Sequence, residues 1–285
     1  MIIRVKFGKE GALRFIGHLD VLRTFQKIFR RADIPMAYSQ GFSPHPIMSF
    51  ALPLGLGLSS EGEYLDAEIV WPEEPGEGDS CPPPDAGEGA PVPEPVPEPV
   101  PELVEGLVEG TGGGDSCPPP EAGEGGPPPK AVVGGGDLLS ALRAATSPDL
   151  PIYAVRRLPE KAGNAMASVG RAAYRLEIRP EWTGELKEAA QALMARESIL
   201  IQKETKSKTV EMDLRPCIHK LEVNQGDSPP HLILHLSAGS KANIKPELVW
   251  ELLNAGYGER KPLSLRRLDL MLEDGTSLGA IGEEL

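Results

Sequence analysis

The sequence predicts an α+β fold built from two ferredoxin-like halves with mostly antiparallel sheets. Three observations lead to this expectation. Short strands and amphipathic helices alternate on both sides of a long segment, residues 72–136, that is rich in Pro, Gly and Glu. After that segment the elements run strand, helix, strand, strand and then strand, helix, strand, which is the order of a split βαβ arrangement. The Pro/Gly/Glu-rich segment has no apolar face of its own, so we interpret it as an insertion between the halves.

In the first half, one helix is expected over residues 19–31. Its apolar side chains Val21, Phe25 and Ile28 follow one another at i, i+4 and i+7 and so share a face. Pro35 ends this helix, because the residue before a proline avoids helical geometry. Strands are expected over residues 2–7, 36–39, 47–52 and 64–70.

The second half contains more elements of the same two kinds. Helices are expected over residues 138–145, 185–195 and 246–254, the last with Pro246 in its first turn. Strands are expected over residues 152–157, 172–179, 198–202, 208–214, 231–236 and 264–272. The predicted domains are therefore residues 1–71, an insertion over 72–136, and residues 137–285.

The insertion carries the net charge of the chain. Residues 72–136 contain eleven Glu and three Asp against one Lys, a net charge of −13, and the remaining 28 basic and 28 acidic side chains balance. The stretch 78–89 returns almost unchanged at 114–125, which indicates a duplicated linker. We expect this acidic linker to be disordered, because it cannot bury enough apolar area to offset the entropy of folding. The folded halves are neutral, so no global field favours or excludes nucleic acid.

Cysteines and apolar runs exclude several classes of protein. The three cysteines, Cys81, Cys117 and Cys217, form neither a Cys-x-x-Cys pair nor a zinc-type spacing, so no metal site is expected from them. The first ten residues lack the apolar core of a signal peptide, and no run approaches eighteen apolar residues. The sequence therefore predicts a soluble cytoplasmic protein that does not bind membranes.

The first of three dense polar runs is Arg14-Phe-Ile-Gly-His-Leu-Asp20. Here His18 and Asp20 lie at the start of the predicted helix, where backbone amides favour an anion, and Arg14 and Arg23 flank them. This arrangement indicates a phosphate pocket. Alternatively, Asp20 caps the helix and His18 bonds to a loop carbonyl, and no ligand is needed.

The second run is Gly41-Phe-Ser-Pro-His-Pro46. Two prolines restrict the backbone around His45, and glycine permits a turn that other residues resist. A rigidly held His45 can act as an acid or base, stack on a nucleobase or contact phosphate. A stiff exposed loop without such a role is the alternative.

The third run, residues 52–64, is rich in Gly and Ser and ends in Glu61-Gly-Glu63-Tyr64. Amides around Ser59 and Ser60 can cradle a phosphate, although no Walker or dinucleotide pattern is present. The acids Glu61 and Glu63 can bind a cation or receive Arg14 or Arg23 across the sheet. We favour a tight turn with solvated acids. The basic segment 203–208, together with Arg215, and the pairs Arg156-Arg157 and Arg266-Arg267 suit either a nucleic-acid backbone or a solvated surface.

Taken together, the three runs resemble the bacterial radical-SAM-linked family, a domain of unknown function that is free-standing or fused to radical SAM proteins with a cobalamin-binding-type domain. The likeness is dense from Arg14 to Tyr64 and looser around Arg157-Leu-Pro159, Ala173-Tyr174 and Lys208 to Pro216. The resemblance implies a radical SAM/cobalamin-type protein as partner. This chain has no Cys-x-x-x-Cys-x-x-Cys, so the iron–sulfur cluster and S-adenosylmethionine are expected on that partner only.

Our first hypothesis is a non-catalytic accessory module that presents a substrate, RNA or a ribosome-associated component, to a radical SAM enzyme. The alternative is a stand-alone RNA-processing or RNA-modifying enzyme, with acid–base chemistry at His18 or His45 and charge stabilisation by Tyr38 or Arg14. A third possibility is a small-molecule or metal site built from His18, Asp20, His45 and Glu63. The expected substrate-binding residues are Arg14, His18, Asp20, Arg23, Lys27, His45, Ser59, Ser60 and Glu63.

Overall fold

The structure is a computed structural model that describes residues 1–70, 135–204, 209–226 and 229–285. The predicted disordered insertion lies outside these residues, except for its last two positions, which belong to a helix. Among the helices that are described, none has both the length and the apolar character needed to cross a membrane.

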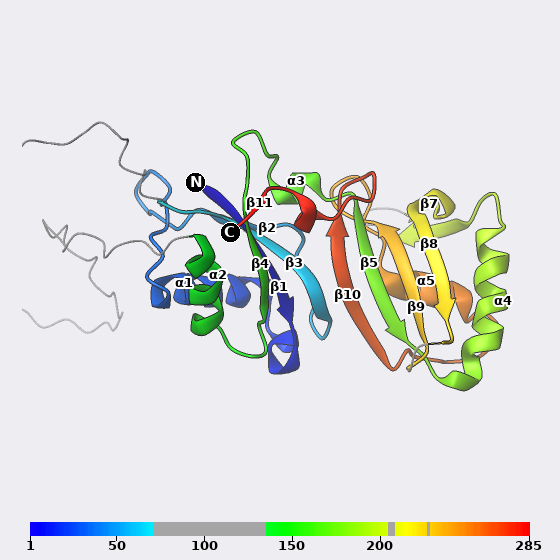
Figure 1. Cartoon of the computed structure of the whole chain (residues 1–285). Helices are drawn as coiled ribbons and strands as arrows, with labels where there is room; N and C mark the ends of the chain where they lie inside the picture. Colours follow the sequence, from blue (N-terminus) through cyan, green and yellow to red (C-terminus); the bar gives the residue numbers. More distant parts are fainter. Residues whose placement is uncertain (71–134, 205–208, 227–228) are drawn as a thin grey trace, which may run out of the picture. The chain divides into compact units, whose positions relative to one another are not determined.

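The first half is a ferredoxin-like unit assembled from both sides of the insertion (Figure 1). Its sheet order is β4-β1-β3, with β2 paired to β3, and all of these pairs are antiparallel. This is the order of a split βαβ unit. Its elements are β1 (Ile2–Lys9), α1 (His18–Arg31), β2 (Met48–Phe50), β3 (Ser59–Glu68), α2 (Gly135–Ala145) and β4 (Ile152–Arg157).

The second half repeats the same arrangement. Its sheet order is β10-β5-β9-β8, and these pairs are also antiparallel. Its elements are β5 (Arg171–Glu177), α4 (Thr183–Met194), β8 (Ile218–Asn224), β9 (His231–Ser237), α5 (Pro246–Leu253) and β10 (Ser264–Met271). The expected α+β fold with two ferredoxin-like halves is therefore confirmed.

The two halves share one continuous sheet. Strand β2 covers β3 only from Leu65 to Ala67, so the start of β3 is free to pair in parallel with β10. Two register pairs make this join, Ser59 with Arg266 and Ser60 with Arg267. After β10, the chain returns to the first half, where β11 (Glu283–Glu284) pairs with β4.

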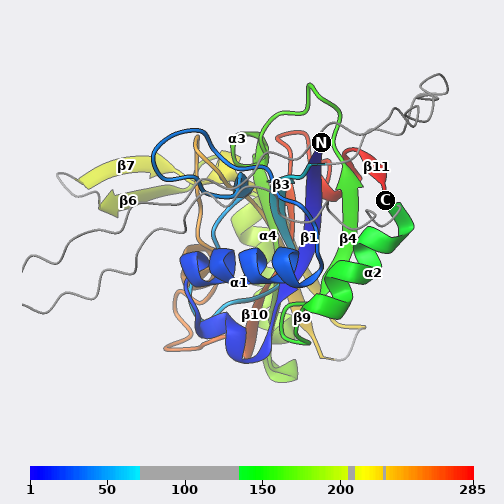
Figure 2. The same ribbon diagram turned by 90° about the vertical axis from the view of Figure 1, so that its left-hand side faces the viewer.

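A few elements lie outside this plan. Strands β6 (Leu200–Glu204) and β7 (Thr209–Asp213) form a separate hairpin that extends to one side of the main sheet (Figure 2). Short helical segments connect the larger elements: η1 (Gly11–Phe15), α3 (Ala165–Ser168), η2 (Pro180–Trp182), η3 (Arg215–Cys217) and η4 (Leu278–Ala280).

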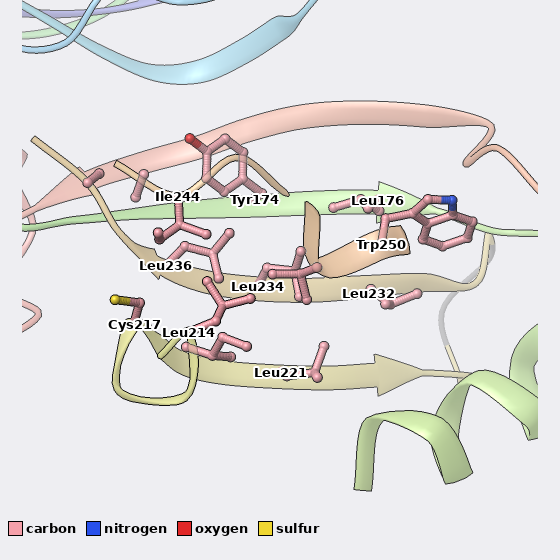
Figure 3. Packing of buried hydrophobic residues seen from close by; sticks show 14 of the residues in the cluster. Tyr174, Leu176, Leu214, Cys217, Leu221, Leu232, Leu234, Leu236, Ile244 and Trp250 are labelled. Atoms are coloured by element: carbon pink, nitrogen blue, oxygen red, sulfur yellow. The ribbon is translucent and has the colours of Figure 1, made fainter. Parts of the chain in front are cut away.

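Each half has its own apolar core. In the first, Val21, Phe25 and Ile28 of α1 pack with β1 and with Leu138 and Leu142 of α2. In the second, Leu232, Leu234 and Leu236 of β9 pack against β5 and α5 (Figure 3). The alternation along β9 and the i, i+4, i+7 spacing along α1 are thus the features that bury these faces.

Several elements differ from their sequence-based expectation. No strand forms over residues 36–39, where only single bridges occur, Met36 with Ile69 and Tyr38 with Pro46. Proline has no N–H, so a ladder through Pro46 cannot continue. Strand β8 was not expected at all, because a register shift between Ile218 and Lys220 breaks its apolar alternation.

The domain boundaries predicted from the sequence place the segment from α2 to β4 almost entirely in the second half, residues 137–285. In the structure β4 pairs with β1, and α2 packs beside α1. This placement follows from edge pairing: β1 lies between two strands, and β4 provides its second neighbour. Residues 135–157 thus complete the first ferredoxin-like unit.

Candidate functional site

The first dense run surrounds the start of α1. Arg14 lies in the last turn of η1, and α1 begins at His18 with Gly17 as its N-cap. Glycine has no side chain, and among the described residues no side-chain group caps this helix end. The alternative in which Asp20 caps the helix is therefore wrong: Asp20 lies inside the first turn and forms an ion pair with Arg23 at 3.2 Å.

Two hydrogen bonds fix the loop before α1. The Lys9 ammonium donates to the carbonyl of Ile16 at 2.8 Å, and the backbone N–H of Gly57 donates to the carbonyl of Arg14 at 2.8 Å. The second bond joins the third dense run to the first, although more than forty residues separate them in the chain. The loop therefore has a defined position on the sheet.

A small pocket lies between these runs and the sheet, and we call it the α1 pocket. Its volume is about 20 Å³, which is room for about one water molecule. Its wall is mostly apolar, with three ionisable side chains among the lining residues. It is lined by Phe7, Lys9, His18, Val21, Phe50, Leu52, Pro53, Leu54 and Glu63.

The carboxylate of Glu63 forms a buried ion pair that joins the halves. Glu63 on β3 is 5% exposed and accepts two hydrogen bonds from Arg267 on β10, one of them from Nε at 2.7 Å. Arg267 also donates to the carbonyl of Leu52 at 2.7 Å. Burial opposes the charge of Arg267, but Glu63 outweighs it, and the pKa of the guanidinium is raised.

The preferred interpretation of Glu63 as a solvated turn residue is therefore wrong. The sequence offered Arg14 and Arg23 as partners, and the actual partner, Arg267, comes from the other half. Sequence spacing could not reveal this pair, because it depends on the parallel join of β3 and β10. The turn itself belongs to β3, which begins at Ser59.

Lys9 is a functional candidate that the sequence analysis missed. It is 3% exposed, and burial lowers the pKa of its ammonium below the usual value, with Glu63 opposing that shift. A sequence signal did exist: Ile3, Val5 and Phe7 occupy the core-facing positions of β1, and Lys9 is the next position in that alternation. A charged residue at a core-facing position marks a site worth inspection.

The two serines and Glu61 lie on the opening residues of β3. Ser60 is fully buried, and its hydroxyl has no hydrogen-bond partner among the described residues. Glu61 accepts from Arg266 at 2.5 Å, and Arg266 also reaches Glu10 at 3.2 Å. Arg266 and Arg267, read from the sequence as one basic pair, thus bind carboxylates in two separate places.

The second dense run does not reach the α1 pocket. The Nδ1 atom of His45 lies 2.8 Å from the hydroxyl of Ser39, which also accepts from the His45 backbone N–H at 3.1 Å. These bonds close the turn around Gly41, whose φ of 125° suits only glycine. His45 and Tyr38 are both exposed at this loop.

Large apolar side chains of the three runs face solvent. Phe15 is 63% exposed and Leu56 is 68% exposed, and they lie on the two segments joined by the bond between Gly57 and Arg14. Leu19, Tyr38 and Phe42 are exposed as well. The guanidinium of Arg14 lies 4.6 Å from the ring centre of Phe15, a cation–π contact. Arg23 and Lys27 are exposed on α1.

Of the predicted site residues, the structure brings His18 and Glu63 to one pocket and leaves the others on the surface around it or elsewhere. Asp20 is paired with Arg23, and His45 is held by Ser39. Within the described ranges, no three His, Cys, Asp or Glu side chains are close enough together to hold a metal ion. The arrangement thus consists of one small pocket with three ionisable lining residues and of exposed apolar and cationic side chains on the surrounding runs.

Comparison with known protein families identifies the family of this chain. A family model described as "Uncharacterized protein conserved in bacteria (DUF2344)" matches residues 3–78 and 133–246. The matched segments include the three dense runs and the strands β1, β3 and β4. No curated protein matches the chain. Because the family model matches about two thirds of the sequence, this protein belongs to the DUF2344 family of uncharacterised bacterial proteins.

Proposed function

We propose that this protein is a non-catalytic accessory module that binds a substrate and presents it to a radical SAM enzyme. RNA, or a component associated with the ribosome, is the proposed substrate. One observation carries the proposal: apolar and cationic side chains of the dense runs are exposed on loops that hydrogen bonds hold in place.

Exposed aromatic and aliphatic groups on a fixed backbone suit recognition. A packed core would bury Phe15, Leu19 and Leu56, since each exposed apolar Å² forgoes about 25 cal/mol of stabilisation. Large apolar side chains exposed close together along the chain are typical of interaction sites in soluble proteins. Because the loops are already ordered, binding there costs less conformational entropy than it would on a disordered segment.

The radical SAM partner is supported by the resemblance of the three runs to the radical-SAM-linked family. The first and third of those runs contribute lining residues to the α1 pocket, and each of the three runs carries an exposed apolar side chain. The chain has only three cysteines, and none of them is spaced for a radical iron–sulfur cluster. The cluster and its S-adenosylmethionine would therefore belong to the partner.

RNA as substrate is supported by the cations and by His18 around the start of α1. Arg14, Arg23 and Lys27 can contact phosphates, and exposed rings at Phe15, Tyr38 or Phe42 can stack on unpaired bases. His18 and His45 are engaged in different places, one at the pocket and one with Ser39. This separation favours recognition over an acid–base pair acting on one substrate atom.

The proposal is tested by co-purification of the tagged chain with radical SAM proteins from the cells that produce it. A double variant, Phe15→Ala with Leu56→Ala, is expected to reduce capture at least tenfold, because it removes exposed apolar contacts. Leu200→Ala is the matched control, since Leu200 is also 63% exposed but lies on the β6–β7 hairpin of the other half. Equal capture by the wild type and the double variant would contradict the proposal.

A further inference from the structure

The inner side of the α1 pocket carries one unbalanced positive charge. Lys9, Arg267 and Glu63 are 3%, 3% and 5% exposed, so two cations and one anion are withdrawn from water together. Glu63 is engaged by two hydrogen bonds from Arg267. Glu63 is also the anion that acts on the Lys9 ammonium, so one carboxylate serves two buried cations, and the three groups keep a net positive charge that is costly in a buried position.

Lys9 also has spare hydrogen-bonding capacity. An ammonium offers three N–H donors, and the described residues provide one acceptor, the carbonyl of Ile16 at 2.8 Å. The same side chain lines the α1 pocket. The remaining donors are therefore available to a group that enters the pocket.

The opposite wall of the pocket is the start of α1. His18, the first residue of this helix, lines the pocket, and no side chain caps the helix end. The free amides of a helix N-terminus and its dipole both favour negative charge. Asp20 is the nearest competing anion in this turn, but its carboxylate is paired with Arg23 at 3.2 Å.

We propose that the α1 pocket binds a phosphoryl group between the Lys9 ammonium, the His18 side chain and the first amides of α1. The pocket volume of about 20 Å³ admits a single phosphoryl oxygen, and the rest of the ligand stays outside. This proposal rests on the proposed function, because it names the part of the RNA substrate that the pocket receives. A terminal phosphate of RNA and free inorganic phosphate share the chemistry described.

The first test is thermal unfolding of the full chain with inorganic phosphate, with acetate, and with chloride at equal ionic strength. Phosphate is expected to raise the Tm, with a shift that grows with the logarithm of its concentration, because it binds the folded state only. Acetate and chloride are expected to give no such shift. A Tm that is independent of phosphate, or an equal shift with acetate, would overturn the proposal.

Two variants assign the effect to the pocket. Lys9→Met keeps the length of the side chain and removes its charge, and His18→Ala changes an exposed residue, so at least one of them should fold. Both are expected to lose the phosphate-dependent shift. Lys6→Met is the control on the same strand. The Nζ atom of Lys6 lies 4.0 Å from Oδ1 of Asp269, outside the α1 pocket lining. A shift that persists in Lys9→Met would contradict the site.

The source of the phosphate is tested with short RNA carrying either a 5′-phosphate or a 5′-hydroxyl. Tighter binding of the phosphorylated RNA, lost in Lys9→Met, supports a terminal phosphate as ligand. Equal binding of the two RNAs would overturn that assignment. Co-purification with the radical SAM protein is measured in parallel. If the radical SAM protein is captured but phosphate has no effect on the Tm, only the phosphate site is contradicted. If phosphate raises the Tm but neither the radical SAM protein nor RNA is bound, only the proposed function is contradicted.

Discussion

At the scale of single residues, the ion pair between Glu63 and Arg267 links the α1 pocket to the join between the halves. Both side chains are nearly inaccessible, and their two hydrogen bonds connect β3 to β10. Breaking one partner of a buried pair is costly, because the remaining charge stays out of water without compensation. The half-exposed pair between Glu61 and Arg266 lies on the same two strands and offers a direct comparison.

Glu63→Gln is expected to lower the free energy of unfolding by about 3–5 kcal/mol, because it leaves Arg267 charged and buried. Urea unfolding of the full chain measures this loss. Glu61→Gln is the control and is expected to cost about 0–1 kcal/mol, since exposed pairs contribute little. Similar losses in the two variants would show that the buried pair has no special role.

Burial of Lys9 should make the free energy of unfolding depend on pH. Its pKa in the folded state is lowered by burial from 10.5, so between the two values the unfolded chain binds more protons. The free energy of unfolding therefore rises with pH between the lowered pKa of folded Lys9 and 10.5. At pH values below the lowered pKa, Lys9 is charged in the folded protein and destabilises it to the full extent. Lys9→Met is expected to be more stable than the wild type near neutral pH without phosphate, by about 1 kcal/mol.

The difference between Lys9→Met and the wild type should shrink as pH approaches 10.5. Measuring the difference by urea unfolding at several pH values cancels the titration of the other lysines and tyrosines. A difference that does not change with pH would mean that Lys9 keeps an ordinary pKa in the folded protein.

The sequence predicted part of this residue-scale chemistry. His18 and Glu63 were expected at a site, and both line the α1 pocket. Lys9 and Arg267 were not expected there. Their roles depend on which face of a strand each occupies and on which strands are neighbours, and both follow from register and sheet order. The spacing of residues along the chain does not indicate register or sheet order.

At the scale of elements, Gly62 permits the close approach of β3 and β10. A Cβ at this position would lie 2.6 Å from the Cα of Asp269 and closer still to the carbonyl oxygen of Leu268. Both are backbone atoms, which cannot move aside as a flexible side chain can. The requirement for glycine therefore comes from the neighbouring strand of the other half.

Gly62→Ala is expected to destabilise the protein by about 1–3 kcal/mol, because the added methyl group forces the two strands apart. The phosphate-dependent rise in Tm should weaken too, since Glu63 is the next residue on β3. Gly184→Ala in α4, where an added Cβ would meet no described atom within 4 Å, is the control and should be neutral or stabilising by about 0.5–1 kcal/mol. A neutral Gly62→Ala would contradict the tight packing of the join.

Elements with clear periodicity were predicted well, and short or irregular ones were not. Helix α1 and strand β9 follow from their apolar spacing. Strand β8 was missed because a bulge interrupts its alternation, and the strand over residues 36–39 failed to form beside Pro46. Bulges and prolines act through backbone hydrogen bonding, which hydrophobic pattern does not report.

At the scale of the whole molecule, the first half is assembled from two distant pieces of chain. Strand β4 and helix α2 follow the acidic insertion, yet they pair with β1 and pack beside α1 (Figure 2). The ferredoxin-like fold class of the two halves could be predicted, because the order of strands and helices along the chain implies it. The assignment of β4 to the first half could not, since it depends on a partner far away in sequence.

A fragment of residues 1–72 is expected to remain unfolded by circular dichroism, because it lacks β4 and the core side chains Leu138 and Leu142. Replacing residues 73–130 by a short Gly/Ser linker should leave cooperative unfolding intact, since residues 1–72 and 131–285 form one compact unit. A folded fragment, or loss of cooperativity on shortening the insertion, would contradict this view of the fold.

For the molecule as a whole, the dense runs are proposed to form a recognition surface for an anionic substrate. The most direct test is the affinity for short single-stranded RNA at low salt, where phosphate contacts are strongest, measured by fluorescence anisotropy. The account predicts that the wild type binds, that Arg14→Ala with His45→Ala weakens binding at least tenfold, and that the exposed Lys187→Ala on α4 has no effect. Absence of binding by the wild type, or equal affinity of the wild type and the double variant, would contradict it.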